Sequence, residues 1–183
     1  MKYKIFDLDG TLFKTPSIAA SGLLEGGVPD FMLPLNDNAN DWWTDPISFD
    51  ERMPIPGLKE VHDAALEAIK DKNTYSILIT HRVPKMEDVI RRLLKRYKLG
   101  FDLVIICNPK IPKPEILMRK HPDFKNAEHV EVYEDSIKQI LSYRELFMKL
   151  NIPYTFKLIS LTHMVTIEKL EVSDMVDVHE IFV

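Results

Sequence analysis

The stretch Lys4-Ile5-Phe6-Asp7-Leu8-Asp9-Gly10-Thr11-Leu12-Phe13 is the part of the sequence from which the fold is best inferred. Its first residues are mainly apolar and predict a short buried strand. Two carboxylates follow this strand one residue apart, and Gly10 then allows a sharp turn. An aspartate at the end of a buried strand can attack phosphorus while a metal ion neutralises the charges. The stretch therefore predicts the active centre of a phosphoryl-transfer enzyme.

The composition is that of an ordinary globular protein. The chain has 183 residues, 45% hydrophobic and 28% charged, which predicts a single domain over 1–183 with its own core. A net charge of −4 does not suggest a general nucleic-acid coat, although it leaves local patches open. Cys107 is the one cysteine, so no internal disulfide forms. With no apolar run of membrane-spanning length and no room for a signal peptide, we expect a cytoplasmic protein without membrane contacts.

Apolar strands and amphipathic helices alternate along the chain. This alternation predicts an α/β fold with three layers, a Rossmann-like arrangement in which helices cover both faces of a mainly parallel, five-stranded sheet. The expected strands are 3–6, 75–79, 102–107, 129–133 and 154–161, with helices after Pro56-Gly57, after Pro84, at 115–119 and after Ser136.

Two segments fall outside this alternation. Residues 14–56 lack a sustained period but contain Trp42-Trp43, so we expect an ordered loop insertion after the first strand, a minimal cap. It forms either part of the site wall or a packing flap without chemistry. Residues 162–183 are a C-terminal extension from which no function follows. Residues 154–160 and 165–172 alternate weakly, and an edge hairpin between them is left open.

The polar residues at the ends of the predicted strands form one group. In a parallel sheet, ligands bind outside the carboxyl ends of the strands. Asp7 and Asp9 end the first strand and Thr80 ends the second, while a lysine follows the third and Glu134-Asp135 end the fourth. The sequence thus predicts a site built from four strand ends.

This pattern resembles the haloacid dehalogenase (HAD) superfamily of phosphohydrolases. Asp7-Leu8-Asp9-Gly10-Thr11 is similar to its first motif, the strand ending in Thr80 to its second, the lysine to its third and Glu134-Asp135 to its fourth. More narrowly, the Trp-Trp loop followed by Thr-x-Arg and Tyr-Glu-Asp resembles the HAD-like domain of the "Swiss Army knife" RNA-repair-like proteins.

The resemblance implies a division of labour between the first two carboxylates. Asp7 would be the nucleophile that forms an aspartyl-phosphate. Asp9 would protonate the leaving oxygen and then accept the proton of the attacking water. The backbone at Gly10 and Thr11 would bind the phosphate, and the Thr11 hydroxyl would order the turn.

The resemblance also implies a metal and a phosphate-binding group. Mg²⁺ would be held by Asp7, Asp9 through its main-chain carbonyl, and Asp135, with Glu134 reaching it directly or through water. Thr80 and Lys113 would bind the phosphoryl oxygens, with Lys110 and Lys125 as alternatives to Lys113.

Three residues depart from the motifs or extend them. His81 stands where glycine usually follows the threonine, and it either lines the pocket and contacts substrate or is a partly buried structural residue. Arg82 offers a planar fork for a second phosphate or a carboxylate, or it pairs with a surface acid. Gln139 replaces a further aspartate that many relatives carry, so the metal would rely on Glu134-Asp135.

The leading hypothesis is a Mg²⁺-dependent phosphomonoesterase, a hydrolase with an open site. Its substrate would be a nucleotide, a nucleic-acid end or another phosphomonoester. The alternative is a catalytically degenerate HAD-like module that binds a phosphorylated partner or nucleic acid; a receiver-like phosphate acceptor ranks last. A basic helix face could follow a nucleic-acid backbone, although such a face is more often simply solvated, and the acidic 14–56 loop would oppose a polyanion. The basic residues are Arg91, Arg92, Lys95, Arg96 and Lys98. The oligomeric state is left open.

Overall fold

The computed structural model describes residues 1–15, 44, 46–49, 57–107, 109–160 and 163–167. One six-stranded sheet organises this part of the chain, with the order β3-β2-β1-β4-β5-β6. The first five strands are parallel and β6 is antiparallel to β5. The strands are β1 (Lys2–Phe6), β2 (Thr74–Thr80), β3 (Leu103–Ile106), β4 (His129–Glu134), β5 (Tyr154–Ile159) and β6 (Met164–Ile167).

Strand β1 lies in the middle of the sheet, and its last two residues, Ile5 and Phe6, are apolar and buried on opposite faces. Ile5 is fully buried and is flanked by Ile77 of β2 and Val132 of β4. Phe6 points to the opposite face and stacks on Tyr133, with ring centroids 4.4 Å apart. Such strands form only where helices cover both faces of the sheet.

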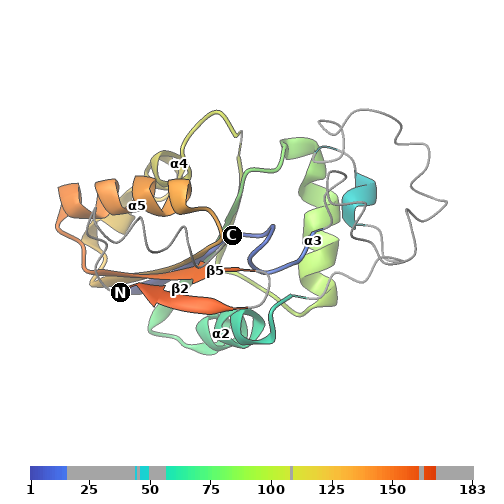
Figure 1. Cartoon of the computed structure of the whole chain (residues 1–183), viewed down its shortest axis with the longest axis horizontal. Coiled ribbons are helices and arrows are strands. Elements are labelled where there is room, and N and C mark those ends of the chain that lie inside the picture. Colours follow the sequence, from blue (N-terminus) through green and yellow to red (C-terminus); the bar gives the residue numbers. More distant parts are fainter. Residues whose placement is uncertain (16–43, 45, 50–56, 108, 161–162, 168–183) are drawn as a thin grey trace.

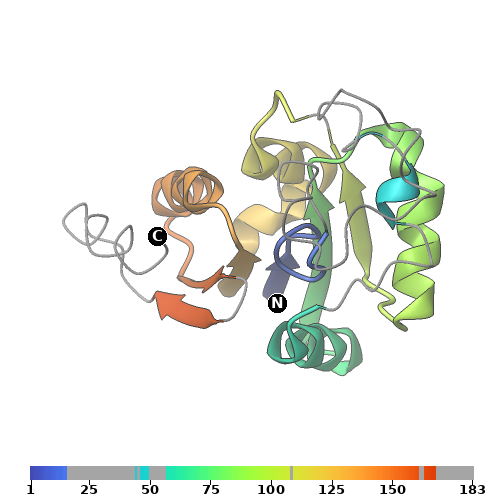
Figure 2. The ribbon, with the colours of Figure 1, turned by 45° about the vertical axis from the view of Figure 1, so that its right-hand side comes forward.

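Helices cover the sheet on both sides (Figures 1 and 2). Buried residues of α2 (Lys59–Lys70) and α3 (Glu87–Arg96) share one core with Phe6 and Leu78. Buried residues of α4 (Lys113–Lys120) and α5 (Ile137–Leu150) share the other with Ile5 and Ile77. The result is a three-layer architecture. None of the helices in the described ranges is long and apolar enough to cross a membrane.

Local sequence signals fix several ends of these elements. The Ser136 side chain accepts a hydrogen bond from the Gln139 amide and caps the start of α5. Asn151 ends this helix in the left-handed conformation, with a φ of 52°. Short 3₁₀ helices complete the described chain: η3 (Pro46–Phe49), η4 (Pro84–Met86) and η5 (Pro122–Asn126).

The architecture agrees with the predicted class. Strand β6 adds one strand to the five that were expected and forms the edge hairpin that the sequence left open, over Met164–Ile167. It pairs with β5 from Ile159 opposite Met164 to Phe156 opposite Ile167. Most of the predicted 14–56 insertion lies outside the described residues, as does the extension from residue 168. Within the insertion, Ser48 and Phe49 are described, and both are buried.

Candidate active site at the strand ends

The carboxyl ends of β1, β2 and β4 lie side by side and hold most of the predicted site residues. Strand pairing continues past β1, because the Asp7 amide donates to the Tyr133 carbonyl at 3.0 Å. A tight turn follows, in which the Gly10 amide donates to Phe13 and the Phe13 amide donates to Leu8. The Asp7 side chain is thereby fixed at the carboxyl end of the central strand β1, next to the residues that end β4.

Lys113 connects the end of β1 to the end of β4. Its Nζ lies 2.7 Å from Asp7 Oδ1 and 2.7 Å from Glu134 Oε2. The Lys113 residue is only 2% exposed although it opens α4 directly after a surface loop. Of the three lysines considered from the sequence, Lys113 is therefore the one directed into the site. Lys110 and Lys125 are exposed.

Burial changes the protonation chemistry of this cluster. It raises the pKa of Asp7 to about 7 and that of Glu134 to about 7, against the attraction of Lys113. Burial alone would lower the pKa of Lys113, but the two carboxylates outweigh it and raise that pKa. The lysine is thus charged at neutral pH, whereas its two acidic partners titrate near pH 7 as a coupled pair.

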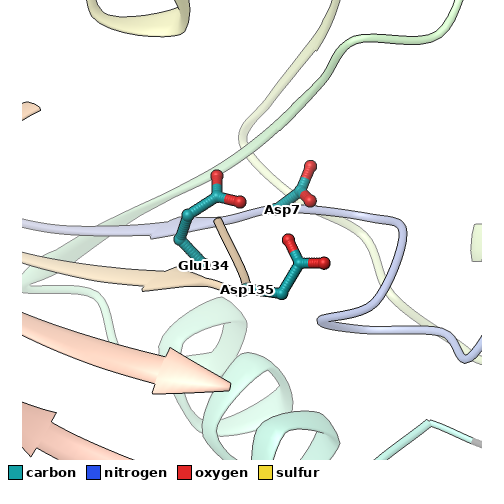
Figure 3. A group of neighbouring side chains, drawn as sticks. All are labelled: Asp7, Glu134 and Asp135. Atoms are coloured by element: carbon teal, nitrogen blue, oxygen red, sulfur yellow. The ribbon is translucent and has the colours of Figure 1, made fainter. Parts of the chain in front are cut away.

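Asp7, Glu134 and Asp135 form a group that could hold a metal ion. One carboxylate oxygen from each lies within 4.8 Å of the others, and Figure 3 shows the three side chains at the ends of β1 and β4. Asp135 is exposed as a residue, yet partial desolvation of its carboxyl and the charge of Asp7 raise its pKa to about 6. Three carboxylates in such a group suit a hard, oxygen-preferring cation such as Mg²⁺.

Gly10 is required where the turn passes the acidic group of Asp7, Glu134 and Asp135. Its φ is +73°, a backbone conformation that favours glycine. A Cβ atom at this position would lie 2.1 Å from Asp135 Oδ2, so any side chain would displace that carboxylate. The glycine therefore allows the turn and the carboxylate to approach each other closely.

Asp9 is hydrogen-bonded to Arg82, which follows β2. Through Arg82, the segment that contains Ser48 and Phe49 also contacts the site. Arg82 Nε donates to Asp9 Oδ2 at 2.8 Å and Nη2 donates to Oδ1 at 2.6 Å. The guanidinium also donates to Ser48 Oγ at 3.2 Å and lies 4.6 Å from the Phe49 ring centroid. Arg82 is only 2% exposed, so this arginine is a buried structural partner of Asp9. Sequence spacing gave no signal for Ser48, because the 14–56 stretch has no period.

Two threonine hydroxyls at the site are buried without a partner among the described residues. They belong to Thr80 at the end of β2 and to Thr11 in the turn after β1, each 1% exposed. A buried hydroxyl is normally hydrogen-bonded, so an unpaired one at strand ends suits a bound polar ligand.

His81 and Gln139 lie around the site but outside the acidic group. The His81 Nε2–H faces the Ile111 carbonyl at 3.0 Å, and burial lowers the pKa of this half-buried imidazole, with help from Lys113. Gln139 occupies the first turn of α5, where its amide oxygen is buried without a partner among the described residues.

Replacing Gly10 by alanine should destabilise the protein. The cost comes from the positive φ and from the displaced Asp135 carboxylate, and we expect a loss of about 1–3 kcal/mol in the free energy of unfolding, measured with urea. The matched control is Gly100→Ala, since no heavy atom lies within 4 Å of its Cβ position. Equal effects of the two substitutions would contradict the close approach described above.

The stability of the metal-free protein should fall as pH rises from about 4 to about 7. Asp7 and Glu134 have folded-state pKa values of about 7, above the ordinary values near 4, so the folded state binds more protons across this window. Urea unfolding at several pH values in EDTA measures the slope. Glu134→Gln removes one of the two groups and should make the decline shallower, whereas a free energy that rises with pH would contradict the assignment.

Comparison with known proteins identifies a family to which most of the sequence is similar. A family model described as HAD domain family 1 in Swiss Army Knife RNA repair proteins matches residues 32–181. This range includes Thr80, Lys113 and Glu134-Asp135, whereas Asp7 and Asp9 precede it. No curated protein matches the sequence.

Two solved structures are similar in fold. A chain of the Pnkp1/Rnl/Hen1 complex is 16% identical with a TM-score of 0.57, over 88% of this chain and 46% of that chain. A chain of the Pnkp1/Rnl/Hen1 RNA repair complex is 16% identical with a TM-score of 0.49, over 87% and 43%. This chain therefore spans less than half the length of either.

These findings confirm the Rossmann-like HAD fold and the resemblance that was read from the motifs. Since the family model covers most of the sequence, the chain belongs to HAD domain family 1 of the Swiss Army Knife RNA repair proteins.

Proposed function

We propose that this protein is a Mg²⁺-dependent phosphomonoesterase that works through an aspartyl-phosphate on Asp7. The observation that carries the proposal is the position of the Asp7 carboxylate. It contacts the buried ammonium of Lys113 and lies within one acidic group with Glu134 and Asp135, at the strand ends where such folds bind ligands. A nucleophile, a buried cation and a group of metal-binding oxygens therefore converge on one point.

The first chemical step transfers the phosphoryl group to the protein. An Asp7 carboxylate oxygen forms a bond to phosphorus as the bond to the leaving oxygen breaks, and Asp9 supplies the proton that this oxygen takes up. In the second step, water attacks the aspartyl-phosphate, Asp9 takes its proton, and inorganic phosphate leaves with Asp7 restored. Two easier displacements replace one difficult hydrolysis.

The charges of the phosphoryl group are neutralised by residues that surround Asp7. Lys113 can turn from the Asp7 oxygen toward a phosphoryl oxygen only a few ångströms away, since its Nζ already lies at this carboxylate. The Thr80 hydroxyl, which has no partner among the described residues, and the Thr11 backbone amide supply hydrogen bonds, whereas the Gly10 amide already donates to the Phe13 carbonyl. Asp7, Asp135 and the Asp9 main-chain carbonyl would hold Mg²⁺, with Glu134 nearby, and the ion would add to the charge neutralisation.

Arg82 positions the proton-transferring carboxylate. Both oxygens of Asp9 are hydrogen-bonded to the guanidinium, so one of these bonds must open before Asp9 can reach a leaving oxygen. The buried contacts with Ser48 and Phe49 keep Arg82 in place meanwhile. Arg82 thus acts on the substrate only through Asp9, whereas the half-buried His81 can line the site without being engaged by Asp9.

A phosphorylated RNA end is the substrate class we favour among phosphomonoesters. The support is the description of the matched family, whose members are RNA repair proteins. A nucleotide or another small phosphomonoester would need the same chemistry at Asp7, so a small phosphomonoester is assayed in parallel with phosphorylated RNA.

A binding module without turnover is the second candidate. Two observations favour it: Arg82 engages both oxygens of Asp9, and Gln139 stands in α5 where an additional carboxylate would support a metal. Such a module would bind a phosphorylated partner at Lys113 and Thr80 and release no phosphate.

The decisive substitution is Asp7→Asn, which keeps the shape of the side chain and removes the nucleophile. We expect Mg²⁺-dependent phosphate release by the wild type from RNA carrying a 3′- or 5′-phosphate or from p-nitrophenyl phosphate, and none in EDTA. The variant should be slower by about a thousandfold or more while it unfolds cooperatively.

The matched control is Asp63→Asn, an exposed carboxylate of α2 that pairs with Lys59. This variant should keep full activity. Affinity for the phosphorylated oligonucleotides without released phosphate would favour the binding module. An Asp7→Asn protein as active as the wild type would rule out the proposed chemistry.

A further inference from the structure

The second half of α3 and the turn after it carry a concentrated positive charge. Residues 91–98 contain five cationic side chains, and no acidic residue occurs from Val89 to Phe101. All five residues are exposed, because Ile90, Leu93 and Leu94 turn the opposite face of the helix into the core. We call this the α3 basic surface; it consists of Arg91, Arg92, Lys95, Arg96 and Lys98.

Few of these charges are neutralised by neighbours in the described part of the chain. Arg91 pairs with Glu87 at 2.6 Å, one turn earlier on the helix. Among the described residues, Arg92, Lys95 and Lys98 have no carboxylate within 4.0 Å. Cations in the last turn complement the helix dipole, but Arg91 and Arg92 precede that turn. The α3 basic surface therefore carries more positive charge than is needed to complement the dipole of α3.

A hollow of about 380 Å³ lies beside the surface, between α3 and the start of β3. Its rim is cationic and its floor is apolar. Gly100 also borders it, and no heavy atom lies within 4 Å of the position where a Cβ would project. The rim includes Arg91, Lys95 and Lys98, and the floor includes Leu94, Phe101 and Val104.

We propose that the α3 basic surface and this hollow bind a single-stranded polynucleotide. Phosphates of the strand would lie on Lys95, Lys98 and their neighbours, and an unpaired base would enter the hollow against Phe101. Phe101 is half-buried and borders the hollow, and cations beside an accessible aromatic face are the combination by which proteins hold single strands. A duplex would satisfy the cations but would have no unpaired base for the apolar floor.

The α3 basic surface lies away from the carboxyl ends of the β-strands. It would therefore bind the body of the polynucleotide and not its phosphorylated end. Helix α3 begins at Glu87, a few residues beyond Thr80, and runs back along the sheet for ten residues, about 15 Å. Glu87 and Asp88 make its first turn acidic, which restricts the contact to the second half. The link to an end held at Asp7 rests on the proposed function, whereas binding by the surface does not.

The test measures binding of a fluorescein-labelled, unphosphorylated RNA of about 12 nucleotides by anisotropy, between about 50 and 200 mM salt. Lys95→Gln with Lys98→Gln should weaken binding about tenfold. It should also reduce the slope of log affinity against log salt by about 1.4, since each lost phosphate contact accounts for about 0.7. The matched control is Lys120→Gln with Lys149→Gln, two exposed lysines of α4 and α5 on the other side of the sheet. This control should leave both quantities unchanged.

A second variant tests the hollow separately from the charge. Phe101→Leu keeps an apolar side chain against Phe6 and removes the ring. We expect roughly fivefold weaker RNA binding with an unchanged salt slope. Unchanged binding by the Lys95/Lys98 variant, or an equal loss of affinity in the α4/α5 control, would contradict RNA binding by the α3 basic surface. A polyglutamate peptide that binds as tightly as the RNA would overturn the polynucleotide assignment.

Activity separates this inference from the proposed function. The Lys95/Lys98 variant should hydrolyse p-nitrophenyl phosphate at the wild-type rate, because neither lysine lies at the site. Asp7→Asn should bind the unphosphorylated RNA as tightly as the wild type. RNA binding without any phosphatase activity would therefore support binding by the α3 basic surface and contradict only the proposed phosphomonoesterase activity.

Discussion

The burial of one ammonium group between two carboxylates organises the site. Lys113 lies between Asp7 and Glu134, 2.7 Å from each, and thereby joins the end of β1 to the end of β4. Removing the charge from such a cluster would leave two carboxylates buried without compensation. The same arrangement could respond to ligands: a cation bound by these carboxylates would replace Lys113 at them and leave its ammonium group for an anion. Structure and chemistry therefore depend on the same three side chains.

Much of the fold follows from the sequence because its signals are local and repeated. The strand around Ile77 and the helices that begin at Pro84 and Ser136 each have a clear period or cap, and parallel topology then sets the edge at which their ends meet. Asp7, Thr80 and Glu134-Asp135 could be grouped in this way without coordinates. Lys113 was harder to select, because a lysine on a surface loop shows no sign of burial until the rest of the chain encloses it.

The remaining features depend on contacts between distant residues. Nothing near Arg82 in the sequence shows that its guanidinium binds Asp9, 73 positions away, or that Ser48 and Phe49 contact it. Strand β6 is short and only weakly alternating, so its pairing with β5 is set by the turn that brings it back rather than by its own pattern. The hollow beside α3 likewise arises where a helix end meets the start of another strand.

The most direct test of the account is to find where the phosphoryl group is carried during turnover. A phosphomonoester is incubated with the protein and Mg²⁺, the reaction is quenched, and the acyl phosphate is reduced with borohydride before peptide mass spectrometry. The account predicts that Asp7, and no other carboxylate, is converted to homoserine, and that the conversion requires substrate. Phosphate release with Asp7 unmodified, or phosphate carried by His81, would contradict the central claim.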